Sequence, residues 1–270
     1  MRKLFSALVI VSLAVPALAI MPNNGPDTTF QYAGFFSHAG GGASAVAIGP
    51  NTILTAAHVA AGDTFTLAGL GSFGVNAGSR IANENADLAM YTTTDTLPGW
   101  YNIDFTALPT GASAVNLVMV GVGMTGGVRP DGLGYETPVD GGAIRRAAVA
   151  HSDMFVADSQ AAFGYDRPSA AIISFLISNG DGAVASGDSG GGLFRQVNGE
   201  WMLVGIGSYI LNTPGVPQYT FAQGNNVFTA SGFTALSEYE DFLNPVPEPA
   251  TMTVLGLGLA AVAARRRRNR

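Results

Sequence analysis

Gly187-Asp188-Ser189-Gly190-Gly191 holds a serine between glycines, directly after an acidic residue. Because glycine adopts backbone conformations that other residues resist, two backbone N–H groups can converge beside an exposed hydroxyl in such a stretch. Converging N–H groups beside a nucleophile are what an oxyanion hole requires. Taken alone, the same five residues are also typical of a tight turn. Residues elsewhere in the chain must therefore decide between a loop and a nucleophile.

A histidine follows a predicted hairpin near the start of the chain. The apolar run Ala45-Val46-Ala47-Ile48 turns at Gly49-Pro50-Asn51 into Thr52-Ile53-Leu54-Thr55, and His58 comes three residues later. Apolar runs separated by Gly, Pro and Asn predict two antiparallel strands. The small residues Ala56 and Ala57 allow the imidazole to lie close to neighbouring backbone.

An aspartate heads a later apolar run, Asn85-Ala86-Asp87-Leu88-Ala89-Met90. The run predicts that the carboxylate of Asp87 is buried, and a buried carboxylate needs a partner such as a histidine N–H. The chain order His58, Asp87, Ser189 matches the template of a histidine base, an orienting aspartate and a serine nucleophile. The alternatives are a hydrogen-bonded core histidine, a turn aspartate and a loop serine.

Four motifs resemble those of the trypsin/chymotrypsin-like serine protease family. They are TAAH at 55–58, NADLAM at 85–90, GDSGG at 187–191, and Gly205-Ile206-Gly207-Ser208-Tyr209, which resembles the strand that follows the family's nucleophile. The resemblance covers about residues 28–240. It implies an all-β fold of two six-stranded antiparallel β-barrels, at about 28–105 and 112–235, with the site between them and a short C-terminal helix.

The resemblance assigns a role to each residue of the triad. Ser189 is expected to attack a peptide carbonyl, His58 to move the proton, and Asp87 to hold His58 in the correct tautomer. The N–H groups of Gly187 and Ser189 are expected to bind the oxyanion. An esterase of the GxSxG type is excluded because its nucleophile precedes its acid and histidine in the chain.

In the family that the chain resembles, the acid before the nucleophile pairs with a buried N-terminal ammonium. That acid is Asp188 here, and cleavage by signal peptidase would expose Ile20 as the new N-terminus. The residues after Ile20 lack the glycines usual in the family, so the alternative is that Asp188 pairs with an arginine such as Arg145 or Arg167. Arg145 and its neighbour Arg146 are expected to form an exposed pair on a strand.

Substrate preference also follows from the resemblance. Trypsin-like members carry an acid six residues before the nucleophile, whereas this chain has Ala183, with Asp181 two residues away. The position two after the substrate-binding Ser208 is often glycine, but here Ile210 follows Tyr209. A branched side chain there is expected to narrow the pocket, as in elastase-like enzymes. We therefore expect cleavage after small apolar residues such as Ala or Val.

Both ends of the chain carry sorting signals. Residues 1–19 have a basic start, an apolar stretch and the small-x-small site Ala17-Leu18-Ala19, which together predict a cleaved signal peptide and a protease domain at 20–246. Residues 247–270 resemble the PEP-CTERM signal of Gram-negative bacteria, with an apolar helix at 250–264 and a basic tail. Processing by an exosortase is expected after transient membrane association through 250–264, and a permanent anchor is the alternative. The destination is the cell surface or the extracellular medium.

Charge and composition limit the possible partners. Residues 20–264 hold six basic and 19 acidic residues, a net charge of −13, which argues against nucleic acid as a partner. The chain has no cysteine and only three well-separated histidines, so a thiol nucleophile and a zinc site are not expected. Asp63, Glu84 and Asp95 match no calcium loop, and we expect no metal and no cofactor.

Short runs rich in Val, Ile, Phe and Thr alternate with Gly, Asn and Pro along the body, a pattern typical of a β-sandwich or barrel. Only 236–243 has the spacing of a helix. Two other functions stay open: a non-catalytic binding module on the same fold, and a structural surface protein. The predicted strands are 32–36, 44–48, 52–55, 64–67, 72–77, 80–82, 88–92, 114–121, 142–149, 154–157, 172–177, 192–196, 201–208 and 218–226.

Overall fold

The computed structural model describes residues 26–39, 41–111, 117–139, 143–178, 180–212, 219–223 and 226–244. The predicted signal peptide, Ile20, the PEP-CTERM segment and its apolar helix lie outside these residues. Within them, no helix is long and apolar enough to cross a bilayer.

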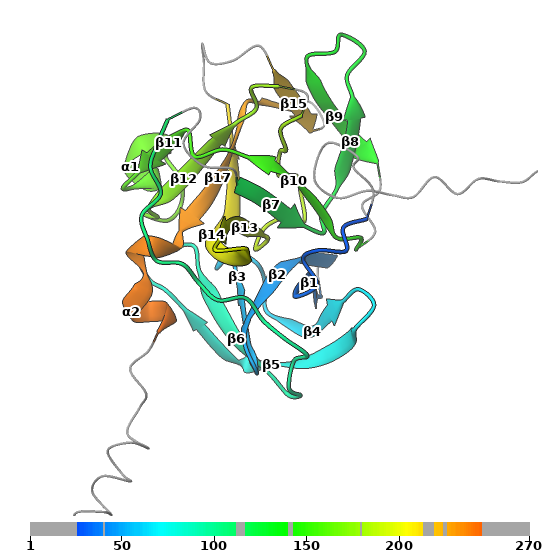
Figure 1. Ribbon diagram of the computed structural model, residues 1–270, viewed down its shortest axis with the longest axis vertical. Coiled ribbons are helices and arrows are strands. Elements are labelled where there is room, and N and C mark those ends of the chain that lie inside the picture. Colours follow the sequence, from blue (N-terminus) through cyan, green and yellow to red (C-terminus); the bar gives the residue numbers. More distant parts are fainter. Residues whose placement is uncertain are drawn as a thin grey trace, which may run out of the picture.

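The first half of the chain is a closed six-stranded barrel with strand order β1-β2-β3-β6-β5-β4. It occupies the blue-to-cyan part of Figure 1. The rings of Phe36 and Tyr91, both almost fully buried, meet in its core with centroids 5.1 Å apart. The strands are β1 (Ala33–His38), β2 (Gly41–Gly49), β3 (Thr52–Thr55), β4 (Gly62–Leu67), β5 (Gly71–Ala82) and β6 (Ala89–Thr93).

The second half is built on a seven-stranded antiparallel sheet with order β10-β7-β13-β14-β17-β12-β11. A closed six-stranded barrel was predicted here. The edge strand β10 instead bonds a loop, because Gly182 N donates to Val149 O (2.7 Å), and the three-residue β11 pairs only with β12. The strands are β7 (Leu117–Gly121), β10 (Arg146–Ala150), β11 (Met154–Val156), β12 (Ala171–Phe175), β13 (Gly192–Val197), β14 (Glu200–Leu211) and β17 (Ala230–Ala235).

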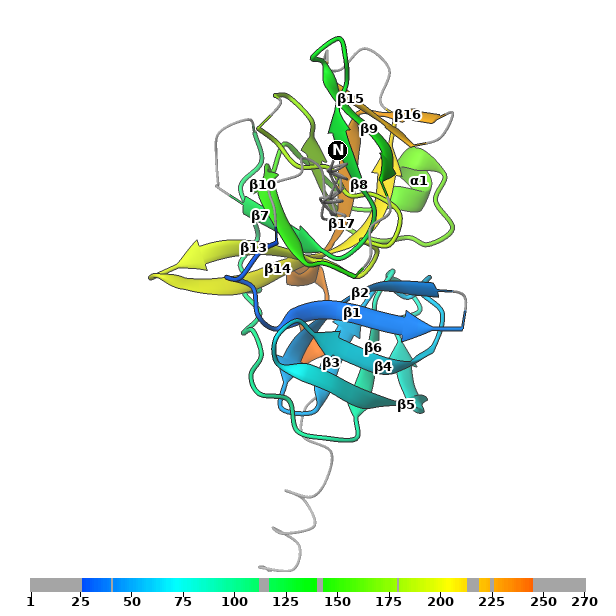
Figure 2. The same ribbon diagram turned by 90° about the vertical axis from the view of Figure 1, so that its right-hand side faces the viewer.

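A separate four-stranded sheet, with order β16-β15-β9-β8, lies at the end of the molecule away from the first barrel (Figure 2). Its hairpins come from β8 (Thr125–Val128) with β9 (Gly134–Val139), and from β15 (Thr220–Gln223) with β16 (Asn226–Phe228). The two hairpins join through the parallel pairing of β9 with β15. Tyr135 and Phe221 of this sheet pack with Ala185 in one buried cluster.

Helices are few and short. Asp158 caps α1 (Ser159–Phe163) by accepting from the amides of Gln160 and Ala161, and Gly164 ends it at φ 74°. The predicted C-terminal helix is present as the 3-10 turn η1 (Leu236–Glu238) followed by α2 (Glu240–Leu243).

Aromatic residues join the two halves. Phe30, just before β1, lies 4.8 Å from Phe194 of β13 and 5.0 Å from Trp201 of β14, measured between ring centroids. Tyr101, in the chain between the halves, lies 4.8 Å from Phe194. Aromatic pairs at these separations add stabilisation beyond the area they bury. The seam therefore holds the halves in a fixed relative position.

Arg145 and Arg146 are buried, so the prediction of an exposed pair is wrong. Their exposed fractions are 4% and 0%. The Arg145 guanidinium can be buried because it bonds the Asp27 carboxylate (Nε to Oδ2, 3.1 Å) and the backbone carbonyls of Asp27, Gln31 and Ala33. This arginine ties the segment before β1 to the second half of the molecule.

Candidate active site

Three side chains from distant parts of the chain form one hydrogen-bonded row. His58 follows β3, Asp87 lies in the bend before β6, and Ser189 lies in the turn before β13. The distance from His58 Nε2 to Ser189 Oγ is 2.8 Å, and from His58 Nδ1 to Asp87 Oδ2 it is 2.6 Å. The aspartate side chain is 7% exposed and the histidine side chain 45% exposed. The row therefore runs from a buried acid to a hydroxyl that solvent can reach.

The Asp87 carboxylate accepts bonds from three directions. His58 N donates to Oδ1 (2.8 Å), while His58 Nδ1 and the Ser208 hydroxyl (2.5 Å) reach Oδ2. Burial alone would raise the pKa of Asp87, but the hydrogen bond and charge of His58 and the bond from Ser208 hold it below its ordinary value. An ionised carboxylate can only accept, so the proton of neutral His58 lies on Nδ1. Nε2 is then free to accept from Ser189.

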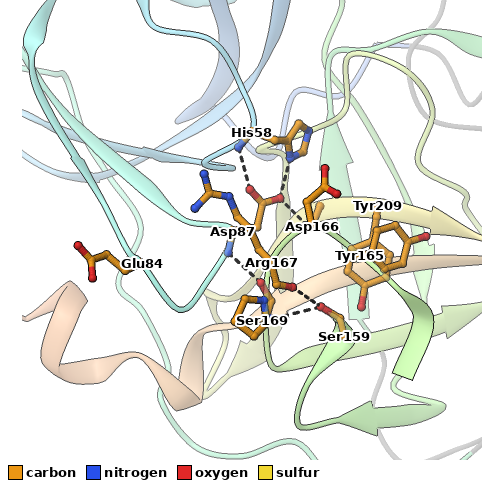
Figure 3. A pocket seen from close by; sticks show the side chains of 11 residues that line it. His58, Glu84, Asp87, Ser159, Tyr165, Asp166, Arg167, Ser169 and Tyr209 are labelled. Atoms are coloured by element: carbon orange, nitrogen blue, oxygen red, sulfur yellow. Dashed lines mark hydrogen bonds and ion pairs between the residues drawn. The ribbon is translucent and has the colours of Figure 1, made fainter. Parts of the chain in front are cut away.

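The backbone of Asp87 is held by a serine from the second half of the molecule. Asp87 N donates to Ser169 Oγ (2.8 Å), and Ser169 N in turn donates to Ser159 Oγ (3.2 Å). Figure 3 shows these bonds beside the two bonds between His58 and Asp87. The acid and the loop after α1 are thus fixed relative to each other.

The turn that carries Ser189 is built on two glycines with positive φ. Gly187 has φ +91° and Gly190 has φ +84°. A Cβ on Gly187 would lie 2.8 Å from Gly123 Cα, and one on Gly190 would lie 2.0 Å from Thr55 Oγ1. Within the described residues, the amides of Gly187 and Ser189 donate to no other protein group. These two N–H groups are available to a ligand beside the Ser189 hydroxyl.

Asp188, the residue before the nucleophile, is 1% exposed. Its Oδ1 accepts from Gly123 N (2.7 Å) and its Oδ2 from Ala185 N (2.8 Å). Arg146 is the arginine coupled to it: burial lowers the pKa of Arg146 to about 10, and the charge of Asp188 opposes that shift. The two predicted arginine partners lie elsewhere, since Arg145 bonds Asp27 and Arg167 lines a cavity beside His58.

A small cavity of about 130 Å³ opens beside Ser189. Its lining includes Ser208, Tyr209 and Ile210, the residues for which a substrate-binding role was predicted. Ala183 is not among the lining residues; it is 1% exposed and packs in the cluster that holds Tyr135 and Phe221. The remaining lining residues are Val184, Ala185, Ser186 and Gly207.

The Asp181 carboxylate is bound away from this cavity. Oδ1 lies 2.9 Å from His151 Nε2, and Oδ2 accepts from the amides of Ile177 and Ser178. Among the described residues that line the small cavity, none is charged. It therefore suits a small uncharged group.

A larger cavity of about 670 Å³ is lined by His58 and Asp87 (Figure 3). Its wall includes the stacked rings of Tyr165 and Tyr209, whose centroids are 4.0 Å apart. The Tyr165 hydroxyl donates to Ile210 O (2.5 Å). Glu84, Asp166 and Arg167 bring charges of both signs to its rim. No group of three His, Asp or Glu side chains that could hold a metal occurs in the described parts of the chain.

Comparisons with known proteins identify the family. The family model for trypsin matches residues 22–230, which is more than half of the chain. The chain belongs to the trypsin family. A second model, the PEP-CTERM protein-sorting motif, matches residues 245–268 and indicates export to the cell surface or beyond. No curated protein matches the sequence of this trypsin-family chain.

Solved structures of trypsin-like proteases share its fold. Mouse neuropsin, a serine protease, is 16% identical with a TM-score of 0.54, and the match covers 80% of this chain and 94% of neuropsin. The Rv3671c protease of Mycobacterium tuberculosis in its inactive form is 16% identical with a TM-score of 0.52, covering 84% of this chain and all of that chain. At this identity the likeness concerns the fold alone.

Three residues of this trypsin-family site were not predicted from the sequence. Ser44 and Ser169 hydrogen-bond to the site from elements that are distant in the chain, and the charge of Arg146 interacts with that of Asp188. Ser44 belongs to a run that predicts a strand but no functional role, and Ser169 belongs to a loop without a motif. Two adjacent arginines predict an exposed pair on a strand, and the apolar residues on both sides of Arg145 and Arg146 were given no weight in that prediction.

Proposed function

We propose that this trypsin-family chain is an exported serine endopeptidase that hydrolyses peptide bonds through Ser189, His58 and Asp87. The observation that carries the proposal is the hydrogen-bonded row from Ser189 Oγ through both nitrogens of His58 to Asp87. A nucleophile, a base within hydrogen-bond reach, and an acid that orients the base are the parts that acyl transfer needs.

In the proposed mechanism, Ser189 Oγ attacks the substrate carbonyl carbon while His58 Nε2 takes the hydroxyl proton. The oxygen that becomes negative accepts bonds from the amides of Gly187 and Ser189. His58 then gives its proton to the leaving amine, the C–N bond breaks, and an acyl-enzyme ester remains on Ser189. Water attacks this ester with the same base and restores the free hydroxyl. Throughout, Asp87 stabilises the protonated imidazole.

The small cavity supports a preference for small apolar side chains before the cut. A volume of about 130 Å³ is below the roughly 150 Å³ of a cavity that takes a benzene ring, and Ile210 is among the lining residues. Because Asp181 is bound to His151, a basic side chain would find no counter-charge there. Ala and Val are the expected residues.

Maturation is proposed to need export and no separate activating cut in the protease domain. Residues 1–19 would be removed by signal peptidase, 20–246 would form the protease domain, and an exosortase would process the segment after 246. Arg146 is buried and its charge interacts with that of Asp188, which supports an internal counter-charge in place of the Ile20 ammonium. Adding one residue before Ile20 should then leave activity unchanged, whereas loss of activity would favour the ammonium.

Labelling with a fluorophosphonate tests the proposal. Purified protein should gain the mass of one adduct, and Ser189→Ala should gain none. His58→Ala should react at least about 100-fold more slowly, because general-base assistance contributes factors of that size. Unlabelled wild-type protein that is folded by circular dichroism would contradict the proposal and favour a binding or structural protein on a protease fold.

A further inference from the structure

Ser44 on β2 links the first barrel to the turn that carries Ser189. Its side chain is almost fully buried, with 1% of the residue exposed. Ser44 Oγ donates to Gly187 O (3.0 Å) and accepts from Val122 N (3.0 Å). A serine hydroxyl has one proton and two lone pairs, so both bonds form together. One hydroxyl thus joins three segments of the chain.

The backbone of Ser44 adds two further bonds at the same place. Ser44 N donates to Ser189 O (2.9 Å), and Ser44 O accepts from Thr55 Oγ1 (2.8 Å). These bonds fix the main chain of Ser44, so only the rotation about its Cα–Cβ bond decides where the hydroxyl points.

Gly187 is the residue that most needs such an anchor. It has no side chain, and at φ +91° its backbone conformation is one that glycine can leave at little cost. The preceding carbonyl, Ser186 O, accepts from Met124 N (2.7 Å). Because a trans peptide holds N–H opposite C=O, this bond aims the Gly187 N–H. The following carbonyl, Gly187 O, is held by Ser44 Oγ.

We propose that Ser44 is a positioning residue for the oxyanion hole: its hydroxyl fixes the Gly187 carbonyl and so keeps the Gly187 N–H aimed at the reacting oxygen. The inference rests on the proposed protease function. Ser44 touches no substrate atom in this role. It acts through the peptide plane after Gly187, while Met124 N holds the plane before it. Its effect is greatest when charge develops on the oxygen in the transition state.

The test compares Ser44→Ala and Ser44→Cys with wild type and with Ser174→Ala. Cysteine keeps the shape with a weaker S–H donor, and the chain has no other cysteine with which it could pair. Ser174 is the matched control because it is also 1% exposed and its Oγ also accepts from a backbone amide, that of His151 (2.9 Å). None of its hydrogen bonds reaches the triad or Gly187.

Ser44→Ala should lower kcat for a peptide substrate about 10- to 100-fold, less than the full loss of an oxyanion donor, with KM changed less than about twofold. Ser44→Cys should fall between alanine and serine. A peptide aldehyde inhibitor forms an adduct that carries the oxyanion. Its affinity for Ser44→Ala should fall by about the same factor as kcat. Ser174→Ala should keep the wild-type kcat even if its Tm falls as far as the Tm of Ser44→Ala does.

Equal kcat values for Ser44→Ala and Ser174→Ala would overturn the inference, as would a loss that appears in KM alone. If Ser44→Ala does not fold, the kcat of Ser44→Cys is compared with the kcat of Ser174→Ala, and equal values would overturn the inference in the same way. A folded wild type that neither cuts peptides nor reacts at Ser189 would contradict the proposed function itself, and with it this role of Ser44.

Discussion

The carboxylate of Asp87 is the charge on which the candidate site depends. It is 5% exposed, and a buried charge is stable only when it is hydrogen-bonded. Bonds from His58 N, His58 Nδ1 and Ser208 Oγ meet that need. They also keep the pKa of Asp87 below its ordinary value, so the carboxylate stays ionised across the neutral range. The orientation of His58 follows from this one group.

Asp87→Asn should lower kcat about 10⁴-fold at neutral pH, because an amide can hold the wrong tautomer of the histidine. Initial rates on a peptide substrate measure the effect, with circular dichroism as the check on folding. Asp166→Asn is the control, since Asp166 lines the neighbouring cavity and is exposed. A loss below tenfold in Asp87→Asn, or an equal loss in the control, would remove Asp87 from the mechanism.

The site residues themselves show what local sequence can and cannot predict. His58, Asp87 and Ser189 lie in short motifs whose neighbours define their surroundings, so their bonded row could be expected. The bond between Ser44 and Gly187 spans 143 positions, and that between Ser169 and Asp87 spans 82. Serine is common in loops and strands alike, so nothing near either residue marks its partner. Such contacts arise only when the two halves pack.

At the scale of elements, strands with clear turns at both ends were predicted best. β3 (Thr52–Thr55) has the predicted bounds, whereas β8 and β9 were missed, because Gly126, Gly127 and Gly134 interrupt any alternation of apolar and polar residues. β17 (Ala230–Ala235) was missed for another reason. All six of its residues are buried, since it lies between β14 and β12, so it has no polar face to reveal a strand.

The pairing of β9 with β15 depends on Gly134. At φ +114°, a Cβ there would lie 1.8 Å from Thr220 O. Gly134→Ala should therefore separate the two hairpins and loosen the packing of the buried cluster that contains Ala185. Ala185 also lines the small cavity. We expect kcat/KM to fall and amides at 134–136 and 220–222 to exchange faster with deuterium.

Gly132→Ala is the matched control for Gly134→Ala. Its φ is +72°, in the same hairpin, but nothing lies within 4 Å of the added Cβ. It should cost only the strain of a left-handed alanine, about 1–2 kcal/mol, with little change in kcat/KM. Similar behaviour of the two variants would show that the close approach to Thr220 is not what matters.

The chain between the two halves is held by an ion pair of Asp104 with Arg195 of β13. Burial alone would raise the pKa of Asp104, but bonds from Thr106 and Arg195 hold it below its ordinary value. A depressed pKa in the fold means that the stabilisation is present above the unfolded pKa of about 3.9 and is lost as pH falls through the folded value.

Asp104→Asn should therefore reduce the free energy of unfolding by about 1–3 kcal/mol at pH 6, with a smaller difference from wild type at pH 3. Urea denaturation at the two pH values measures both differences. Asp63→Asn, at an exposed position of β4, should match wild type at pH 6, because exposed charges contribute little. If the loss of unfolding free energy in Asp104→Asn were larger at pH 3 than at pH 6, this would contradict a lowered pKa of Asp104 in the folded protein.

At the scale of the molecule, the two halves meet closely beside the nucleophile. Gly190 lies so near the first barrel that an added Cβ would be 2.0 Å from Thr55 Oγ1 and 2.1 Å from Ser44 O. Ser44 N bonds Ser189 O at the same place. The turn that carries Ser189 belongs to the second half by sequence but is held by the first.

Gly190→Ala should push the first barrel away from this turn and lower kcat/KM more than about 100-fold, the scale of a 1 Å displacement at a reacting group. Gly199→Ala is its control, because Gly199 also has positive φ (+87°) and nothing lies within 4 Å of the added Cβ. The control should lose stability but not activity. Comparable activity in both variants would mean that the barrel contact tolerates displacement.

The anchoring of the Ser189 turn by Ser44 has a consequence for how this protein fails when heated. A slight parting of the two halves would break the short bonds to Gly187 and Ser189 before the core that both halves share is lost. Cutting should therefore cease several degrees below the temperature at which the protein melts, and return on cooling. Under the proposed function, the protein would then stop cutting neighbouring surface proteins before its own chain unfolds.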